Sequence, residues 1–235
     1  METTFRDRTE AGRRLAELVA TRVPAAAPDP IVLALPRGGV PVAFEVARRL
    51  EATLDIFLVR KLGVPGHEEL AMGALASGGV RVLNEEVITG LGVPPEEIER
   101  VTDAERRELE RREQLYRGER PAPSVRGRAV ILVDDGLATG STMRAAVAAV
   151  RKLGPERIVV AVPTAAPSTC EEFRRLADDC LCVITPEPFR AVGLWYDDFA
   201  QTTDEEVRVL LARSARQEEL PASDLPAKSG TEAWE

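Results

Sequence analysis

The sequence predicts an α/β protein in which helices cover both faces of a parallel sheet. Apolar runs of strand length, such as 31–35 and 129–133, are typical of parallel strands that are buried on both faces. Segments with helical periodicity lie between these runs, and this alternation builds βα units. With 44% hydrophobic and 30% charged residues, the chain of 235 residues has the composition of an ordinary globular domain.

The first half of the chain is expected to supply two strands of that sheet. Its predicted elements are a helix at 9–21, a strand at 31–35, a helix at 40–50, a strand at 55–60 and a short strand at 80–83. The glycine-rich segment 61–79, which precedes the short strand, predicts a mobile loop, with a terminal hairpin as an open alternative.

A long charged helix at 94–118, started by two prolines, separates the two halves. Its acidic and basic residues recur at i,i+4 spacing, which is typical of a solvated face; a partner-binding helix is the alternative. The second half then predicts a strand at 129–133, a helix at 141–153, a strand at 157–162, a helix at 168–177, a strand at 181–184 and a helix at 204–215.

Charge and composition exclude several classes of protein. The formal net charge of −8 argues against a general nucleic-acid binder, which needs a basic face. The chain lacks an apolar run of membrane-spanning length and begins with a charged, polar segment, so we expect a cytoplasmic protein without membrane contacts. The three cysteines, Cys170, Cys180 and Cys182, contain no CxxC pair and are expected to be buried thiols rather than a disulfide or zinc site.

The segment with the clearest chemistry is 130–142, VILVDDGLATGST. A buried strand ends in Asp134 and Asp135, at the edge of a parallel sheet where ligands bind. A turn then opens a helix, whose free amide groups can hold a phosphate. The two acids suit a pair of hydroxyl groups or a Mg²⁺ ion, so a ribose 5-phosphate fits the whole set. The alternative is a helix cap formed by Thr139 or Ser141.

This segment resembles the ribose-phosphate signature of type I phosphoribosyltransferases. The segments ALPRGGVPVAFEVA and VRKLGVPGHEELAMGA, in the order that the family shows, most resemble a bacterial subgroup of that family. The resemblance covers roughly residues 8–212. It implies the parallel-sheet fold of the family with a small hood, and Mg²⁺-dependent transfer from 5-phosphoribosyl 1-diphosphate to a nucleobase or base-like acceptor, with release of pyrophosphate.

The resemblance assigns roles to individual residues. The 5-phosphate would meet Ala138, Thr139, Gly140, Ser141 and Thr142. Pyrophosphate would meet Arg37, Gly38 and Gly39, in a loop where the family often has a cis peptide, expected here near Pro36–Arg37. Arg60 and Lys61 would add positive charge at the leaving group, and Asp134 and Asp135 would hold the ribose and the metal ion, directly or through water. The segment 63–79 takes the place of the catalytic loop, where a role for His67, the only histidine, is open.

The acceptor is less well defined. Trp195 or Tyr196 is expected to stack on the base, with Asp197 or Asp198 as hydrogen-bond partner; packing of both aromatic side chains is an equal alternative. Ala138 stands where family members that use 6-oxopurines carry an acid, which disfavours those acceptors and leaves the general base unassigned.

The expected organisation is one domain at 1–216, with an inserted region at about 84–122 and a hood contribution at 190–202. A disordered tail is expected at 217–235. Small-molecule substrates are the expected partners, without nucleic acid, and a homodimer stays an open expectation. Two other functions remain open: a regulator that senses a nucleotide or the phosphoribosyl donor without turnover, and an enzyme repurposed for an unusual acceptor.

Overall fold

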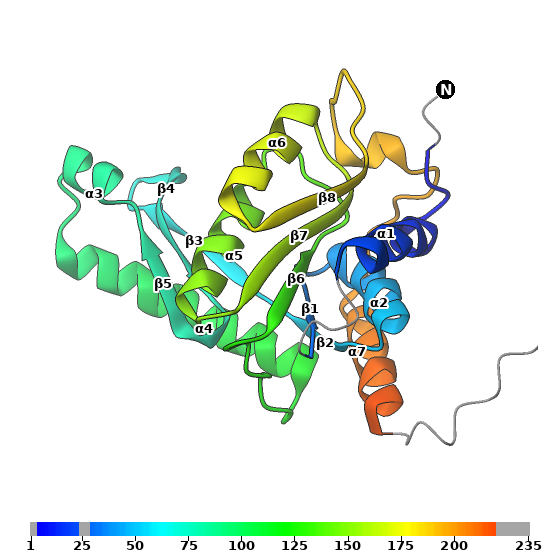
Figure 1. The fold of residues 1–235 in the computed structure, drawn as a ribbon. Helices are drawn as coiled ribbons and strands as arrows, with labels where there is room; N and C mark the ends of the chain where they lie inside the picture. Colours follow the sequence, from blue (N-terminus) through cyan, green and yellow to red (C-terminus); the bar gives the residue numbers. More distant parts are fainter. Residues whose placement is uncertain (1–3, 24–28, 220–235) are drawn as a thin grey trace, which may run out of the picture.

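A five-stranded parallel sheet forms the centre of the computed structural model, which describes residues 4–23 and 29–219 (Figure 1). The strand order is β2-β1-β6-β7-β8, and each neighbouring pair is parallel. The strands are β1 (Ile31–Ala34), β2 (Thr53–Ile56), β6 (Ala129–Val133), β7 (Arg157–Thr164) and β8 (Asp179–Ile184). The predicted α/β class with a parallel sheet is confirmed.

Helices cover both faces of this sheet, also as predicted (Figure 1). One face packs against α1 (Arg8–Arg22), α2 (Gly39–Leu50) and α7 (Asp204–Glu219). The other face packs against α5 (Ser141–Lys152) and α6 (Pro167–Leu176).

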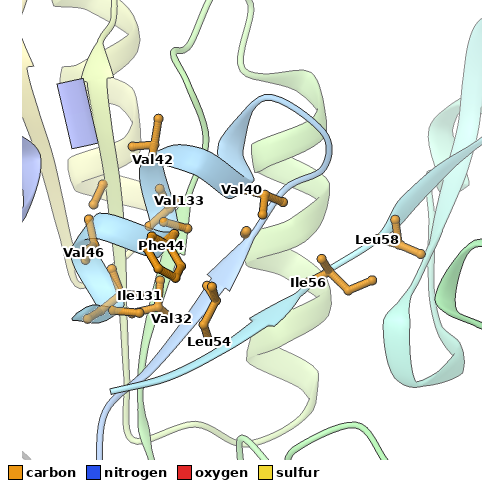
Figure 2. Close-up of a cluster of buried hydrophobic side chains, with 14 of the residues drawn as sticks. Val32, Val40, Val42, Phe44, Val46, Leu54, Ile56, Leu58, Ile131 and Val133 are labelled. Atoms are coloured by element: carbon orange, nitrogen blue, oxygen red, sulfur yellow. The ribbon is translucent and has the colours of Figure 1, made fainter. Parts of the chain in front are cut away.

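The hydrophobic core forms two layers because side chains alternate along each strand. On β1, Val32 and Ala34 belong to the layer with α1, α2 and α7, whereas Ile31 and Leu33 belong to the layer with α5 and α6. Figure 2 shows part of the first layer, where these strand and helix side chains meet: Val32, Val40, Val42, Phe44, Val46, Leu54, Ile56, Ile131 and Val133. Burial on both faces explains why the strands appear as uninterrupted apolar runs in the sequence.

A second, antiparallel sheet corrects two predictions. It contains β3 (Val59–Val64), β4 (His67–Ala76) and β5 (Val80–Leu83). The predicted strand 55–60 is wrong in extent, since β2 ends at Ile56 and β3 enters a different sheet. The predicted mobile loop at 61–79 is wrong as well, and the hairpin alternative describes most of it. Its glycines allow close strand approach: a Cβ atom on Gly73 would lie 2.5 Å from the Val82 carbonyl oxygen.

The region between the two sheets is helical. A short helix that we did not predict, α3 (Glu85–Leu91), is capped by the Asn84 side chain, which accepts a hydrogen bond from the Val87 amide. The predicted charged helix is present as α4 (Pro95–Arg117). It contacts β3 and β4 on one side and α7 on the other, so it links the small sheet to the main one.

The last helix extends further than predicted. Helix α7 continues to Glu219, so the first three residues of the predicted tail are helical, and 220–235 lie outside the described residues. The described part of the chain holds no helix of the length and apolarity that a membrane crossing needs.

The cysteine prediction also needs correction. Cys170 of α6 and Cys182 of β8 form a disulfide, and only Cys180 is a free, buried thiol. The sequence contains no spacing that signals this pairing, because it depends on how α6 folds back onto β8.

Candidate active site

The two loops singled out in the sequence lie side by side at one edge of the main sheet. Their strands, β1 and β6, are parallel neighbours, so both loops leave from the same edge. A Cβ atom on Gly39 would lie 2.8 Å from the Val133 carbonyl oxygen, and one on Gly38 would overlap the carboxylate of Asp135. Only glycine permits this approach. The Pro36–Arg37 peptide is cis, as expected.

The acidic pair lies where the two loops meet. The Asp134 carboxylate accepts a hydrogen bond from the Asp135 amide at 2.8 Å. Burial, together with the neighbouring charge of Asp135, raises the pKa of Asp134 well above its ordinary value. Burial also raises the pKa of Asp135, against the opposing effect of Arg8. Two adjacent carboxylates withdrawn from water favour a ligand that supplies positive charge or hydroxyl donors.

Arg8, at the start of α1, is a site residue that sequence reasoning missed. Its Nε and Nη2 atoms lie 2.9 and 2.8 Å from the same Asp135 carboxylate oxygen. Its Nη1 atom donates to the Ala200 carbonyl, and its guanidinium lies 3.9 Å from the centre of the Phe199 ring. No local motif marks Arg8, because its partners lie more than a hundred residues further along the chain.

The N-terminal segment and the predicted hood form one unit. The Phe5 amide donates to the Trp195 carbonyl, and the Asp197 amide donates back to the Phe5 carbonyl, both at 2.8 Å. The Asp197 carboxylate accepts from the Thr4 hydroxyl at 2.7 Å. This unit lies against the acidic loop, because Arg8 and Tyr196 both hydrogen-bond to Asp135.

The predicted acceptor residues differ in their availability. Tyr196 is buried between Phe5 and Phe199, and its hydroxyl donates to the Asp135 carbonyl at 2.5 Å. This ring supports the acidic loop, whereas the packing alternative had placed it between the last helix and the sheet. Trp195 is half-buried, with a buried indole N–H that has no partner among the described residues. Phe199, which was not singled out, presents a partly exposed ring beside Arg8.

The loop expected to bind phosphate opens α5. Gly140 is its N-cap, with a left-handed φ of 69°, and no side chain caps the helix. A Cβ atom at Gly140 would also lie 2.5 Å from the Phe173 ring. Thr139 and Ser141 hydrogen-bond to each other at 3.1 Å instead of capping the helix. The first turn contains no acid, so its free amide groups favour an anion.

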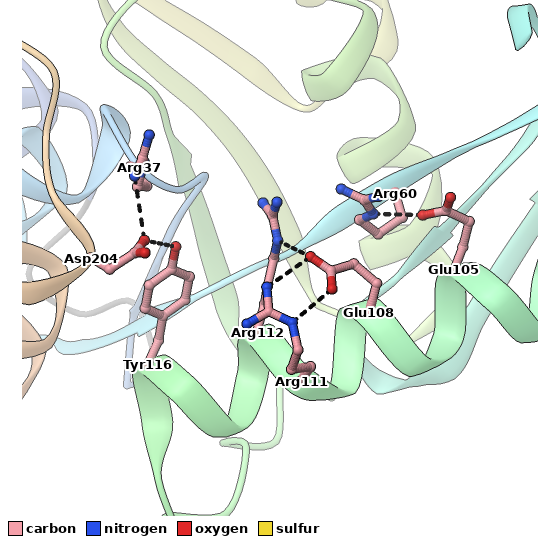
Figure 3. A network of polar contacts seen from close by, with 8 residues as sticks. All are labelled: Arg37, Arg60, Glu105, Glu108, Arg111, Arg112, Tyr116 and Asp204. Atoms are coloured by element: carbon pink, nitrogen blue, oxygen red, sulfur yellow. Dashed lines mark hydrogen bonds and ion pairs between the residues drawn. The ribbon is translucent and has the colours of Figure 1, made fainter.

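The predicted pyrophosphate-binding cation, Arg37, is tied to two other elements (Figure 3). It lies 3.5 Å from the carboxylate of Asp204, the first residue of α7. Asp204 also accepts a hydrogen bond from the Tyr116 hydroxyl of α4 at 2.6 Å. Burial and this hydrogen bond raise the pKa of Tyr116 to about 12.

The other two predicted cations lie on β3, in the second sheet. Arg60 donates to the Glu105 carboxylate of α4 at 2.6 Å, and Lys61 lies 4.0 Å from the carboxylate of Glu69. Neither forms a hydrogen bond or ion pair with the acidic loop within the described ranges. His67, whose role was open, is exposed at the start of β4.

The acidic pair fits a hard metal ion by its chemistry. One oxygen of each carboxylate, Oδ2 of Asp134 and Oδ1 of Asp135, has no hydrogen-bond partner in the part of the chain that is described. Carboxylate oxygens beside a ligand phosphate are the donors that Mg²⁺ takes in proteins, usually with several waters.

The chain is similar to several known proteins. Two Mycobacterium tuberculosis proteins, from strains CDC 1551 and H37Rv, are each 44% identical over 212 residues and provisionally named as phosphoribosyl transferases. The matched region is 90% of this chain and 47% of each relative, so the chain spans about half the length of these curated relatives.

A solved structure and a family match complete the comparison. The crystal structure of TT1426 from Thermus thermophilus has a TM-score of 0.79 and 44% identity, covering 90% of this chain and 99% of that chain. The family model described as a phosphoribosyl transferase domain matches residues 7–198. This match spans both loops, the acidic pair and the small sheet, and it shows that the chain belongs to the phosphoribosyl transferase domain family.

Proposed function

We propose that this protein transfers the phosphoribosyl group of 5-phosphoribosyl 1-diphosphate to a nucleobase or base-like acceptor, with Mg²⁺, and releases pyrophosphate. The main observation behind this proposal is the direct packing of Gly38 and Gly39 against the loop that holds Asp134 and Asp135. This contact places a candidate pyrophosphate site directly beside a candidate ribose site. The uncapped start of α5 provides the third part, a site for the 5-phosphate.

Each part has a defined task in this reaction. Breaking the bond between C1 and the pyrophosphate oxygen leaves positive charge on the ribose ring and negative charge on the leaving group. Asp134 and Asp135 would hold the ribose hydroxyls and the metal ion, which supplies charge neutralisation when bound. Residues 138–142 would fix the 5-phosphate. Arg37 with the amides of Gly38 and Gly39 would bind the pyrophosphate, and Arg60 and Lys61 would approach it from the hairpin.

The acceptor would bind between the acidic pair and the segment 195–199. Trp195 offers a half-buried ring and a buried N–H that no described residue pairs with, and Asp197 offers a carboxylate at the exposed edge. Phe199 adds a partly exposed aromatic ring beside Arg8. Such a set suits a flat, aromatic acceptor with polar edges. Tyr196, already engaged with Asp135, would act by supporting the loop.

The first experiment is a calorimetric titration of 5-phosphoribosyl 1-diphosphate into the protein, with and without Mg²⁺. The control is the double variant Asp134→Asn/Asp135→Asn. We expect binding that requires both Mg²⁺ and the acids. Pyrophosphate release across a panel of bases then tests turnover. Absence of binding by the unmodified protein would overturn the proposal, and binding without turnover on any base would favour the donor-sensing regulator.

A further inference from the structure

Helix α4 directs one row of side chains toward the pyrophosphate side of the candidate site. Glu105, Glu108, Arg112 and Tyr116 follow each other at spacings of three, four and four residues, so they share one face of the helix. Figure 3 shows these side chains along α4, with Arg37 and Arg60 near the two ends of the row. These four residues are half-buried or buried, whereas the expected solvated face of α4 lies at exposed positions such as Asp103, Arg107 and Glu110.

The carboxylates at the two ends of this row hold two of the three proposed pyrophosphate cations, Arg37 and Arg60. At one end, the Tyr116 hydroxyl donates to Asp204, which pairs with Arg37. At the other end, Glu105 accepts from Arg60. Cations from the loop after β1 and from β3 are therefore both held beside the same helix.

Arg112 is the cation of this row, and its guanidinium forms a hydrogen bond through only one of its three nitrogen atoms in the part of the chain that the structure describes. Its Nε atom donates to Glu108 at 2.7 Å, while its two Nη atoms have no hydrogen-bond partner among the residues that the structure describes. The hydrogen bond from Tyr116 lowers the pKa of Asp204, and the charges of Arg37 and Arg112 lower it further. Figure 3 shows the Arg112 side chain on the stretch of α4 between Arg37 and Arg60.

We propose that Arg112 binds the pyrophosphate group of the donor through its free Nη atoms, as a further cation beside Arg37, Arg60 and Lys61. This inference rests on the proposed function, because it needs pyrophosphate at the loop after β1. Glu108 has a positioning role, since it fixes the Nε end of the guanidinium and leaves the Nη edge to the ligand. An arginine with one edge anchored loses little side-chain entropy when the other edge binds an anion.

The inference gives α4 a function in this chain. The helix would carry one leaving-group cation itself and hold Arg37 and Arg60 in readiness through acidic partners. Each partner also prevents repulsion among the cations while no anion is bound.

The test is a calorimetric titration of pyrophosphate with Mg²⁺, and separately of ribose 5-phosphate, into three variants. Arg112→Ala removes the proposed contact. Arg112→Lys keeps the charge without the planar guanidinium. Arg111→Ala is the matched control, because Arg111 also donates to Glu108 but extends from a different face of the helix. Thermal unfolding of each variant verifies that the fold is retained.

We expect Arg112→Ala to weaken pyrophosphate binding about tenfold, the loss of one charge-assisted hydrogen bond, while ribose 5-phosphate binding stays unchanged. Arg112→Lys should lie between Arg112→Ala and the unmodified protein, and Arg111→Ala should bind within about twofold of it. If Arg112→Ala binds pyrophosphate as tightly as the unmodified protein, or if it loses affinity equally for both ligands, the inference about Arg112 is overturned and the proposed function still stands. Failure of the unmodified protein to bind either ligand would overturn the proposed function and the inference with it.

Discussion

At the scale of the residue, Asp135 connects the most distant parts of the chain. Arg8 from the N-terminus holds its side chain, and Tyr196 from near the C-terminus holds its carbonyl. Gly38 leaves room for its carboxylate. Three segments thus fix one acid of the candidate ribose site, which keeps it in place before a ligand arrives.

Replacing Arg8 should therefore cost stability as well as ligand binding. Arg8 and Asp135 are 11% and 15% exposed, so Arg8→Ala leaves a largely buried carboxylate without its counter-charge. We expect a loss of about 3 kcal/mol in the free energy of unfolding, measured by urea denaturation at neutral pH. Arg13→Ala, which removes an exposed arginine from the same helix, should cost less than about 1 kcal/mol. Similar losses for the two variants would show that the Arg8 pair has no special role.

The two tyrosines offer a second test at this scale, since the chain contains no others. In Tyr196→Phe, the remaining Tyr116 should titrate with a pKa of about 12, raised first by burial and then by its hydrogen bond to Asp204. Because the folded pKa is the higher one, this residue's contribution to stability is complete below about pH 10 and is lost as the pH rises through 12. Phenolate absorbance measures the titration, and a midpoint near 10 in the folded protein would contradict the burial of Tyr116 and its hydrogen bond to Asp204.

At the scale of the element, a substitution at the start of α5 can distinguish a phosphate site from an ordinary helix cap. Ser141→Asp places an acid in a first turn that has none, which should stabilise the helix by about 0.5 kcal/mol. The same charge should repel a bound 5-phosphate and weaken ribose 5-phosphate binding at least tenfold. The effects on stability and on binding therefore have opposite signs.

Ala148→Asp is the control for this prediction, because it adds the same charge two turns further along α5. Its binding of ribose 5-phosphate should stay within about twofold of the unmodified protein, because charges at that separation are largely screened. If Ser141→Asp binds ribose 5-phosphate as tightly as the unmodified protein does, the loop is an ordinary helix cap and not a phosphate site.

The elements of the main sheet could be predicted because their signals are local. β1, β6 and β7 are apolar runs of strand length, and the segment between β6 and α5 carries its own motif. The hairpin of β3 and β4 was only an open alternative to a mobile loop, because glycines indicate flexibility in a sequence but allow close strand contact in the structure. Arg8, Phe199 and Asp204 joined the site through tertiary contacts alone, and the disulfide of Cys170 depends on the same kind of information.

At the scale of the whole molecule, one buried ion pair joins the helical insertion to the main sheet. Asp55 lies on β2 and Arg117 ends α4; their side chains are 7% and 8% exposed, and the closest atoms are 3.0 Å apart. Burial raises the pKa of Asp55 even though Arg117 opposes the shift, so desolvation of the carboxylate outweighs its attraction to the guanidinium. Such a pair adds little net stability, yet either partner left alone is strongly destabilising.

A double-mutant cycle on this pair should therefore be far from additive. We expect Asp55→Ala and Arg117→Ala each to lower the free energy of unfolding by about 3 kcal/mol, and the double variant to lose about 2 kcal/mol less than their sum. The exposed pair of Glu17 and Arg49 is the control, and its coupling should be below about 1 kcal/mol. Because Arg117 anchors the helix that carries Arg112, the Arg117→Ala variant should also exchange the amide hydrogens of α4 faster than those of β6. Additive losses, or equal exchange rates in α4 and β6, would mean that apolar contacts hold α4 to the sheet. The row that contains Arg112 would then be positioned without help from the ion pair.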